Sequence, residues 1–253
     1  MVRSLLVANW KMYKTVAESQ AFVQEWLERR AKTDRAAEQV ICPTLPALYV
    51  LAQALRGRDI RVGAQTLDLG REGANTGAVS GYLLREAGAS YVIVGHSERR
   101  RLYGEDDAVV RDQAVAALEC GLKPIICVGE SRAERELGRT DAVILHQVQS
   151  VIQALNDLAD TVFAYEPVWA IGTGLVPTAE EADRVAGVIQ DALVRAYPNS
   201  GGTVRILYGG SVNRQTVREF AAAPRLDGAL VGGASLDVEH WIALNQGWME
   251  VRG

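Results

Sequence analysis

The middle of this chain reads Val162-Phe-Ala-Tyr-Glu-Pro-Val-Trp-Ala-Ile-Gly-Thr173. Its first four residues are apolar or aromatic and predict a short buried strand, so Glu166 comes at the carboxyl end of that strand. Parallel α/β folds place their ligands at the carboxyl ends of the strands. We therefore interpret Glu166 as a functional carboxylate.

The residues after this carboxylate have the composition of a hinged loop. Pro167 stiffens the entry, and Trp169 is an apolar group that a closed loop can dock. Gly172 and Gly174 can absorb backbone rotation. Together with Glu166, these residues indicate a catalytic base beneath a loop that can close over it. The alternative is an ordinary strand-to-helix loop.

Similar short runs, rich in β-branched residues, recur on both sides of this strand and alternate with longer amphipathic segments. The predicted strands cover residues 5–9, 40–42, 61–64, 91–94, 124–128, 162–165, 204–208 and 228–231. Eight consecutive βα units in 253 residues predict an α/β fold, a single (β/α)8 barrel of eight parallel strands. We expect residues 1–253 to form one domain, and an open doubly wound sheet is the structural alternative.

Helix signals lie between the predicted strands. Thr15-x-x-Glu18 and Thr178-x-x-Glu181 are capping boxes at the start of a helix. In a capping box, each of the two side chains accepts a hydrogen bond from the backbone N–H of the other residue. Gly88 and Gly121 stand where other helices should end with a left-handed residue.

Composition excludes several classes of protein. The chain is 48% hydrophobic with a net charge of −4, which excludes disorder as the main state and gives no basic stripe for nucleic acid or membrane. No apolar stretch reaches the roughly 18 residues of a membrane helix. Cys42, Cys120 and Cys127 are an odd number of cysteines without CxxC spacing, so we expect reduced thiols and a cytoplasmic protein. The histidines lack the spacing of a zinc site, so we expect no metal.

Glycine pairs follow the last two predicted strands, in Tyr208-Gly-Gly-Ser211 and Val231-Gly-Gly-Ala234. Without side chains, their backbone N–H groups can approach an anion. Barrel enzymes often bind phosphate at the loops after strands seven and eight. The pairs therefore indicate a phosphate site, and tight turning alone is the alternative.

Polar side chains follow other strands at the same predicted end of the barrel. His96 comes just after the strand at 91–94, where an imidazole can polarise a carbonyl or move protons, and Glu98 lies on the same loop. A structural role is the usual alternative for a single histidine. Lys11, beside Asn9, can neutralise a bound phosphate or a developing enediolate. Lys11 could instead form a Schiff base, as in a sugar-phosphate lyase, and a barrel that only binds phosphate is a third hypothesis.

Six ordered segments resemble the triosephosphate isomerase family over nearly the whole chain. They are Ala8-Asn-Trp-Lys-Met12, Val94-Gly-His-Ser-Glu-Arg-Arg100, Cys127-Val-Gly-Glu130, Ala164-Tyr-Glu-Pro-Val-Trp-Ala-Ile-Gly-Thr-Gly174, Tyr208-Gly-Gly-Ser-Val212 and Asp227-Gly-Ala-Leu-Val-Gly-Gly-Ala-Ser235. The resemblance implies a TIM barrel that interconverts dihydroxyacetone phosphate and D-glyceraldehyde 3-phosphate through an enediolate, in glycolysis and gluconeogenesis. It also implies that no cofactor is needed.

The resemblance assigns a role to each polar group of the predicted site. The assigned roles are base for Glu166, neutral electrophile for His96, orientation of the substrate for Asn9, positive charge for Lys11, support for Glu98, and phosphate binding for Gly172, Ser211, Gly232 and Gly233. Closure of a lid over the enediolate is likewise carried over from the family.

The family resemblance also implies a homodimer, in which the loop after the third strand crosses into the partner's site. Gly73-Ala-Asn-Thr-Gly77 corresponds to the tip of this loop, and Thr76 would approach the partner's Asn9. This chain departs from the family pattern at three places: Ala78 replaces the glutamate common after Thr-Gly, Leu175 stands where a basic residue is frequent, and Ala8 with Tyr13 flank the Asn-x-Lys pattern differently from many relatives.

Overall fold

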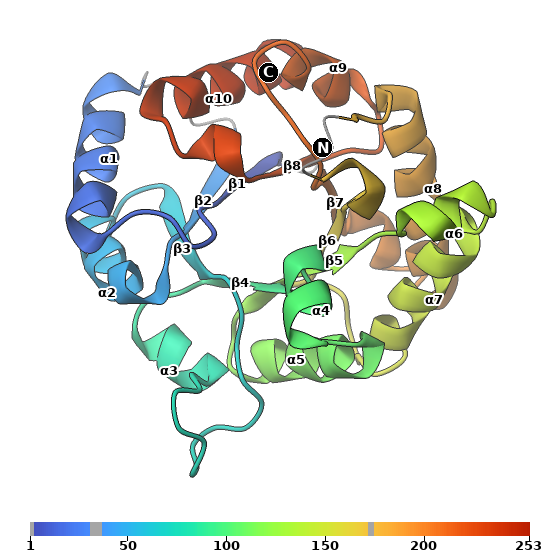
Figure 1. The fold of residues 1–253 in the computed structure, drawn as a ribbon, viewed down its shortest axis with the longest axis horizontal. Helices are drawn as coiled ribbons and strands as arrows, with labels where there is room; N and C mark the ends of the chain where they lie inside the picture. The colour runs from blue at the N-terminus through green and yellow to red at the C-terminus, as the bar shows by residue number, and fades with distance from the viewer. Residues whose placement is uncertain (1–2, 31–36, 172–174) are drawn as a thin grey trace.

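Eight parallel strands close into a barrel in sequence order, as Figure 1 shows in a view down the short axis of the molecule. The computed structural model describes residues 3–30, 37–171 and 175–253. The strands are β1 (Leu5–Asn9), β2 (Glu38–Cys42), β3 (Ile60–Ala64), β4 (Tyr91–Val94), β5 (Lys123–Val128), β6 (Val162–Tyr165), β7 (Arg205–Tyr208) and β8 (Gly228–Val231). The barrel closes where β1 pairs with β8, with Leu5 opposite Gly228. The predicted fold is confirmed, and the open doubly wound sheet is wrong.

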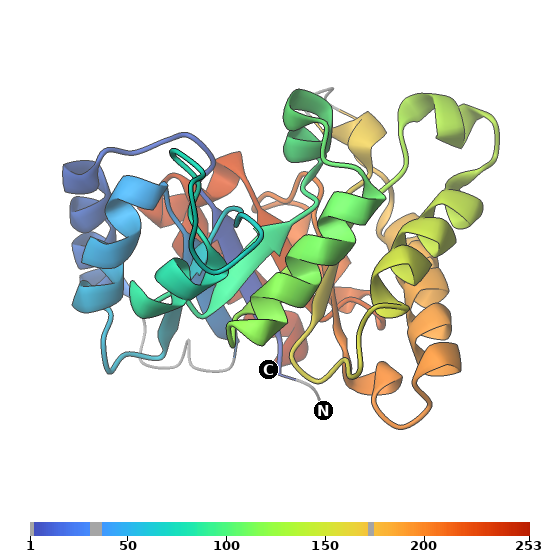
Figure 2. The same cartoon turned by 90° about the horizontal axis from the view of Figure 1, so that it is seen from below.

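Helices surround this barrel (Figure 1). They are α1 (Val16–Arg29), α2 (Leu45–Ala54), α3 (Gly81–Glu86), α4 (Ser97–Tyr103), α5 (Asp107–Glu119), α6 (Arg132–Glu136), α7 (Thr140–Ile152), α8 (Ala179–Ala196), α9 (Val217–Ala222) and α10 (Val238–Arg252). In the side view of Figure 2, the short helices α4 and α6 lie at the upper end, opposite the C-terminus. They follow β4 and β5 directly, so the upper end holds the carboxyl ends of the strands.

Four strand starts differ from the prediction by one or two residues. β2 begins at Glu38 and β5 at Lys123, both earlier than the apolar runs that predicted them. Their polar side chains are engaged at the amino end of the barrel, where Lys123 pairs with Asp160 at 2.8 Å. β3 begins at Ile60, one residue early, and β7 at Arg205, one residue late. A hydrophobic pattern misses the starts of β2 and β5 because these strand ends carry a charged residue.

The predicted helix signals are confirmed. The capping boxes at Thr15 and Thr178 are both formed, each with the glutamate three residues on. Gly88 and Gly121 adopt φ values of 102° and 72°, in the left-handed region that favours glycine. The helix starts and stops are therefore encoded locally.

Alternation along the strands divides the buried side chains into two layers. On β1, Leu5 and Val7 belong to the cluster that fills the barrel, while Leu6 and Ala8 belong to the larger cluster beneath the helices. Successive residues of a strand point to opposite faces, which produces this division. The barrel interior is packed with side chains, so its open rim is the place where a ligand can enter.

A partly buried polar cluster joins three strands at the amino end of the barrel. The hydroxyl of Tyr91 donates to Glu38 Oε1 at 2.8 Å, and Arg205 Nη1 contacts Glu38 Oε2 at 2.7 Å. Arg205 Nη2 also donates to the Tyr91 hydroxyl oxygen at 2.8 Å. Burial raises the pKa of Glu38, but hydrogen bonds from Arg205 and Tyr91 outweigh it and the net pKa is lowered.

Replacing Glu38 by Gln is expected to lower the free energy of unfolding by about 1–3 kcal/mol at pH 7, because Arg205 loses its charged partner. The folded pKa of Glu38 lies below its unfolded value of 4.5. Its contribution is therefore complete above that unfolded value and is lost as pH falls through the folded pKa. Urea unfolding should show a gap between the wild type and Glu38→Gln at pH 7 that narrows at acid pH. The same substitution at exposed Glu86 is the control, and a gap that widened in acid would contradict this linkage.

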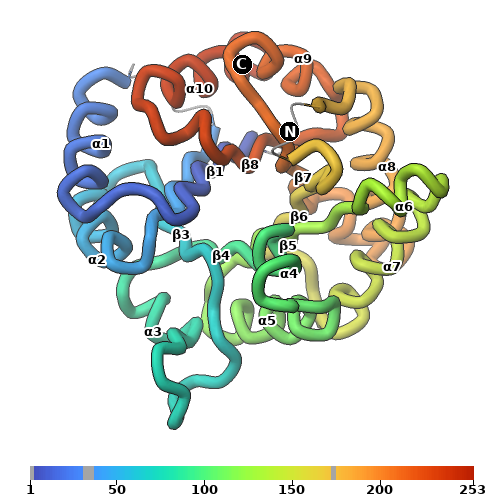
Figure 3. The backbone as a smooth tube through the Cα atoms, viewed as in Figure 1, coloured from blue at the N-terminus to red at the C-terminus, as the bar shows by residue number. Residues whose placement is uncertain are grey.

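The segment between β3 and α3 extends away from the barrel wall, as the teal part of the tube in Figure 3 shows. Two backbone hydrogen bonds tighten its tip, from Asn75 to Gly73 at 3.0 Å and from Ala78 to Asn75 at 3.2 Å. Thr76 is exposed at this tip. Within residues 3–30, 37–171 and 175–253, every helix is too short or too polar to cross a membrane.

Candidate active site

The predicted site residues gather around one cavity of about 340 Å³ at the carboxyl rim of the barrel. The residues that line it include Asn9 and Lys11 after β1, His96 after β4, Glu166 after β6, Gly209, Gly210 and Ser211 after β7, and Gly232 and Gly233 after β8. These residues come from five strands that lie far apart in the sequence. Closure of the barrel is what brings their ends to one place.

A carboxylate and an imidazole meet inside this cavity. Glu166 Oε1 lies 3.0 Å from His96 Nε2, and the two residues are 2% and 6% exposed. The second carboxylate oxygen, Oε2, accepts the backbone N–H of Ser97 at 2.9 Å. A buried acid thus sits within hydrogen-bonding reach of a group that can donate or accept a proton.

The backbone fixes the proton of the His96 ring. Its Nδ1 accepts the N–H of Glu98 at 3.2 Å, at the start of α4. A nitrogen that accepts a hydrogen bond carries no proton, so a neutral ring has its proton on Nε2, toward the cavity. Burial lowers the pKa of His96, but the charge of Glu166 raises it. The net result is a pKa above the ordinary value as long as His96 and Glu166 stay in contact.

Opposing effects also act on Glu166. Burial raises its pKa, while the charge and hydrogen bond of His96 and the N–H of Ser97 lower it, and the net pKa falls below the ordinary value of 4.5. Glu166 is therefore ionised at neutral pH. Loss of its two partners would leave burial as the main influence and would raise this pKa.

Lys11 is held beside the imidazole by a network. Its Nζ lies 2.7 Å from Glu98 Oε1, and its backbone N–H donates to Asn9 Oδ1 at 3.0 Å. Gln65 Nε2 donates to the Lys11 carbonyl oxygen at 2.8 Å. Lys11 has a φ of 50°, which is uncommon for a residue with a side chain. These contacts hold that conformation and aim the ammonium at the cavity.

The glycine pair after β8 lies against this lysine. A Cβ built on Gly232 would be 3.2 Å from Lys11 Cε and 3.6 Å from Nζ. Glycine at 232 thus leaves room for the lysine, and Gly233 is open to the solvent. Backbone N–H groups and an ammonium at one end of the cavity suit a phosphate. The predicted phosphate ligand Gly172 lies outside the described residues, as do Thr173 and Gly174.

Close backbone approaches explain two further glycines around Glu166. A Cβ on Gly129, after β5, would lie 1.7 Å from the Glu166 carbonyl oxygen. A Cβ on Gly209, after β7, would lie 2.7 Å from Glu166 Cγ. Gly129 therefore leaves space for the backbone of Glu166, and Gly209 leaves space for its side chain.

Trp169, on a 3₁₀ turn (Val168–Ala170), is anchored to its surroundings. Its Nε1 donates to Glu130 Oε1 at 2.8 Å, and the Arg135 guanidinium lies 4.1 Å from the centre of its ring. The segment that leaves Glu166 is therefore fastened to the loop after β5 up to this point.

Sequence reasoning missed two members of the network. Ser97 contributes a backbone N–H, which leaves no trace in the identity of the residue. Gln65 directly follows β3, so the rule that polar residues after strands build the site would have identified it. The other two histidines, His146 and His240, lie exposed on α7 and α10.

The buried cysteines take no part in nucleophilic chemistry. Cys42, Cys120 and Cys127 are all free thiols. Burial raises the pKa of Cys42 and Cys127 well above the ordinary thiol value, so both stay protonated. A protonated thiol is a poor nucleophile.

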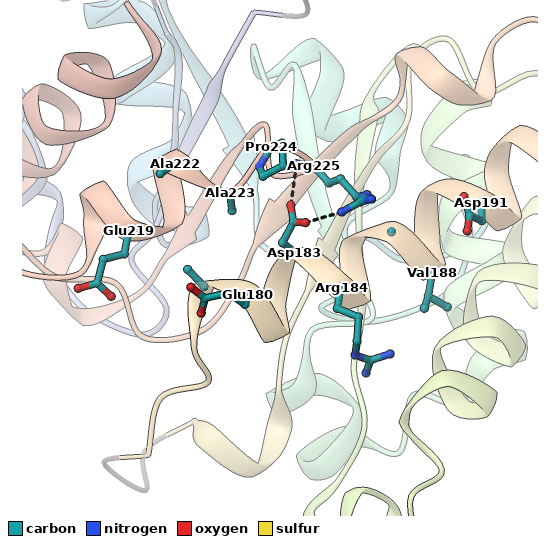
Figure 4. Close-up of a pocket in the computed structure, with 12 residues that line it drawn as sticks. Glu180, Asp183, Arg184, Val188, Asp191, Glu219, Ala222, Ala223, Pro224 and Arg225 are labelled. Carbon is teal, nitrogen blue, oxygen red and sulfur yellow. Dashed lines mark hydrogen bonds and ion pairs between the residues drawn. The ribbon is translucent and has the colours of Figure 1, made fainter.

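A larger groove, of about 590 Å³, lies between α8 and the residues that end α9 (Figure 4). Asp183 pairs with Arg225 across it, and the carboxylates of Glu180 and Glu219 line one end. It lacks a histidine, and Glu180 and Glu219 are both exposed. The smaller cavity at the strand ends, with its buried acid, is the better candidate for chemistry.

Fold and cavity together define a (β/α)8-barrel enzyme, with acid–base groups at the carboxyl rim and a place for an anion. The family model described as triosephosphate isomerase matches residues 4–247. The chain belongs to the triosephosphate isomerase family.

Similar proteins from several bacteria support this family assignment. The triosephosphate isomerase of Aquifex aeolicus is 44% identical over 94% of this chain and 96% of its own length. That of Synechococcus sp. strain JA-2-3B'a(2-13) is 46% identical over 95% of each chain. The crystal structure of triosephosphate isomerase from Bartonella henselae superposes with a TM-score of 0.86 at 33% identity, covering 98% of this chain and all of its own.

Proposed function

We propose that the cavity at the strand ends is the active site of this isomerase, with Glu166 as the base and His96 as the electrophile. The family reaction interconverts dihydroxyacetone phosphate and D-glyceraldehyde 3-phosphate, in glycolysis and gluconeogenesis. The observation that carries the assignment is the 3.0 Å contact between Glu166 and His96, both buried, beside the open glycine pair of β8.

The reaction moves one proton between adjacent carbons. Glu166 takes the proton from C1 of dihydroxyacetone phosphate, and the electron pair left behind forms the C1=C2 bond of an enediolate. The charge that develops on the C2 oxygen accepts a hydrogen bond from His96 Nε2–H, and Lys11 supplies positive charge. The hydroxyl proton moves from the C1 oxygen to the C2 oxygen, and Glu166 returns its proton to C2 to give the aldehyde.

Substrate entry would also strengthen the base. The substrate oxygen must take the His96 Nε2–H that Glu166 now holds. Without the charge and hydrogen bond of His96, the effects that oppose burial weaken, so the pKa of Glu166 rises. A carboxylate that is ionised before binding and more basic after binding suits a proton transfer near neutral pH.

The remaining groups hold and orient the substrate. Ser211, Gly232 and Gly233 would bind the phosphate, mainly through backbone N–H groups, together with Gly172. Asn9 would orient the oxygens, and its Oδ1 already fixes the backbone of Lys11. Glu98 supports both Lys11 and His96 from the first turn of α4.

A coupled assay tests this function directly. The purified protein should convert D-glyceraldehyde 3-phosphate to dihydroxyacetone phosphate, detected through its reduction by a coupling dehydrogenase, with chelator present throughout. Absence of turnover would overturn the function. The Schiff-base hypothesis predicts instead that borohydride with substrate labels Lys11. The 2.7 Å ion pair with Glu98 disfavours it, because a Schiff base needs a free amine.

We also propose that two chains assemble into a homodimer, with the loop tip at Thr76 seated in the partner. A second cavity of about 480 Å³ adjoins the site and shares Asn9, Lys11 and His96 with it. Large apolar side chains are exposed around it, and Met12 is 93% exposed. Such a surface is typical of a protein interface.

Sedimentation velocity at micromolar concentration is expected to show a dimer. Thr76→Arg should shift the protein toward a monomer and lower its activity, whereas Gln153→Arg, an exposed change on another face, should not. A fully active wild-type monomer would contradict the proposal. The free thiols further support a cytoplasmic enzyme, which fractionation of the host cell can test.

A further inference from the structure

Asn213 lies at the phosphate end of the cavity, two residues after Ser211. It lines the same cavity as Ser211, Gly232 and Gly233, on the loop that follows β7. Neither the spacing of the glycine pairs nor the strand-end pattern points to it. Its side chain is the only carboxamide besides Asn9 in the described lining of this cavity.

The oxygen of this carboxamide accepts hydrogen bonds from the backbone that follows it in the chain. Asn213 Oδ1 accepts the backbone N–H of Gln215 at 2.9 Å and that of Thr216 at 3.0 Å. The hydroxyl of Thr216 lies 3.3 Å from the same oxygen. Backbone N–H groups can only meet an acceptor, so the oxygen must face them and Nδ2 must face the other way.

Asn213 is an exposed residue of the cavity lining, so its amide nitrogen is the polar group that this side chain has left for the solvent or for a ligand in the cavity. It carries two N–H donors, and no hydrogen bond from Nδ2 to a residue in the described part of the chain is formed. The one carboxylate of the described lining, Glu166, already accepts from His96 and Ser97. The one cation of the described lining is Lys11, whose side chain approaches Gly232. A donor in these surroundings is complementary to an anion.

We propose that Asn213 is a further phosphate-binding residue, whose Nδ2–H donates to a phosphate oxygen of the substrate and favours phosphorylated over unphosphorylated trioses. This inference rests on the proposed active site and names one more residue in it. Asn213 touches the phosphate end and not the reacting carbons, so its effect belongs to binding rather than to proton transfer.

The substitution Asn213→Asp removes the donor and keeps the acceptor. Aspartate keeps an oxygen for the N–H groups of Gln215 and Thr216, so the loop should keep its shape, while the second oxygen replaces Nδ2. The hydrogen bond from Nδ2 to the phosphate is lost, and the aspartate adds a negative charge that repels the phosphate. The KM for D-glyceraldehyde 3-phosphate and the inhibition constant of inorganic phosphate should both rise by about tenfold to a hundredfold. The kcat should change little.

Two further measurements separate this role from a structural one. Isomerisation of glyceraldehyde, which has no phosphate, should be unchanged in Asn213→Asp. The binding defect should shrink as salt is raised, because salt screens the repulsion between the aspartate and the phosphate. Asn156→Asp, the same change at an exposed position on another face, is the matched control and should resemble the wild type.

The possible outcomes distinguish this inference from the proposed function. If the wild type isomerises but Asn213→Asp keeps the wild-type KM and phosphate inhibition, the inference is wrong and the active site stands. If Asn213→Asp also loses glyceraldehyde turnover, the residue serves the loop and the phosphate role is wrong. A wild type without activity on either triose would overturn the proposed function itself.

Discussion

Glu166→Gln is expected to lower kcat/KM by about 10²–10⁴-fold, because a positioned base contributes about that factor to a proton transfer. The amide cannot take a proton from carbon. It also cannot satisfy both present partners, since His96 Nε2–H and the Ser97 N–H both donate to the carboxylate. One donor of the amide must face one of them, so a modest loss of stability of about 1–3 kcal/mol should accompany the kinetic effect.

Glu180→Gln is the matched control for this prediction. Glu180 is an exposed glutamate in the larger groove between α8 and α9, and its substitution should leave turnover unchanged. Circular dichroism should show both variants folded. The assignment would be overturned if Glu166→Gln isomerised at nearly the wild-type rate, and the groove would become the candidate site if Glu180→Gln were the inactive variant.

Gly209→Ala should cost about 100-fold in kcat, since a displacement of about 1 Å at a reacting group can lower a rate by that much. The added Cβ would lie 2.7 Å from Glu166 Cγ and 3.2 Å from the Tyr165 carbonyl oxygen. The backbone oxygen yields less easily than a side chain, so the carboxylate must move. Inhibition by inorganic phosphate should persist, because the proposed phosphate-binding residues Gly232 and Gly233 lie on a different loop, after β8.

The control for this variant is Gly202→Ala, where the nearest atom to an added Cβ is Val194 Cγ2 at 3.9 Å. Steady-state kinetics of both variants should show a fall in kcat for Gly209→Ala alone. A wild-type kcat in Gly209→Ala would mean that the base tolerates displacement, which would contradict the close packing described around it.

Much of the fold and of the site could be predicted from the sequence, because both are encoded by short local patterns. The eight apolar runs gave the strands, and the capping boxes at Thr15 and Thr178 gave two helix starts. The rule that catalytic groups follow the strands then selected Glu166, His96 and Lys11, and the structure brings all three to one cavity.

What the sequence could not predict depends on register and on backbone groups. The strand starts at Glu38 and Lys123 were missed because their charges are satisfied by distant partners, Arg205 of β7 for Glu38 and Asp160 in the turn before β6 for Lys123. The N–H of Ser97 is a backbone donor, so no residue type marks it. The role of Asn213 depends on which way its amide is turned, and only the hydrogen bonds to Gln215 and Thr216 reveal that orientation.

The cluster of Glu38, Tyr91 and Arg205 joins β2, β4 and β7 at the amino end of the barrel, opposite the proposed active site. Strands that are not neighbours in the barrel are thus held together independently of the loops that form the proposed site. The barrel should therefore tolerate loops of different length and sequence at its carboxyl end without unfolding. Because the amino end stabilises the barrel and the loops at the carboxyl end bind the substrate, proteins that evolve from this fold could acquire new substrates without changes at the amino end.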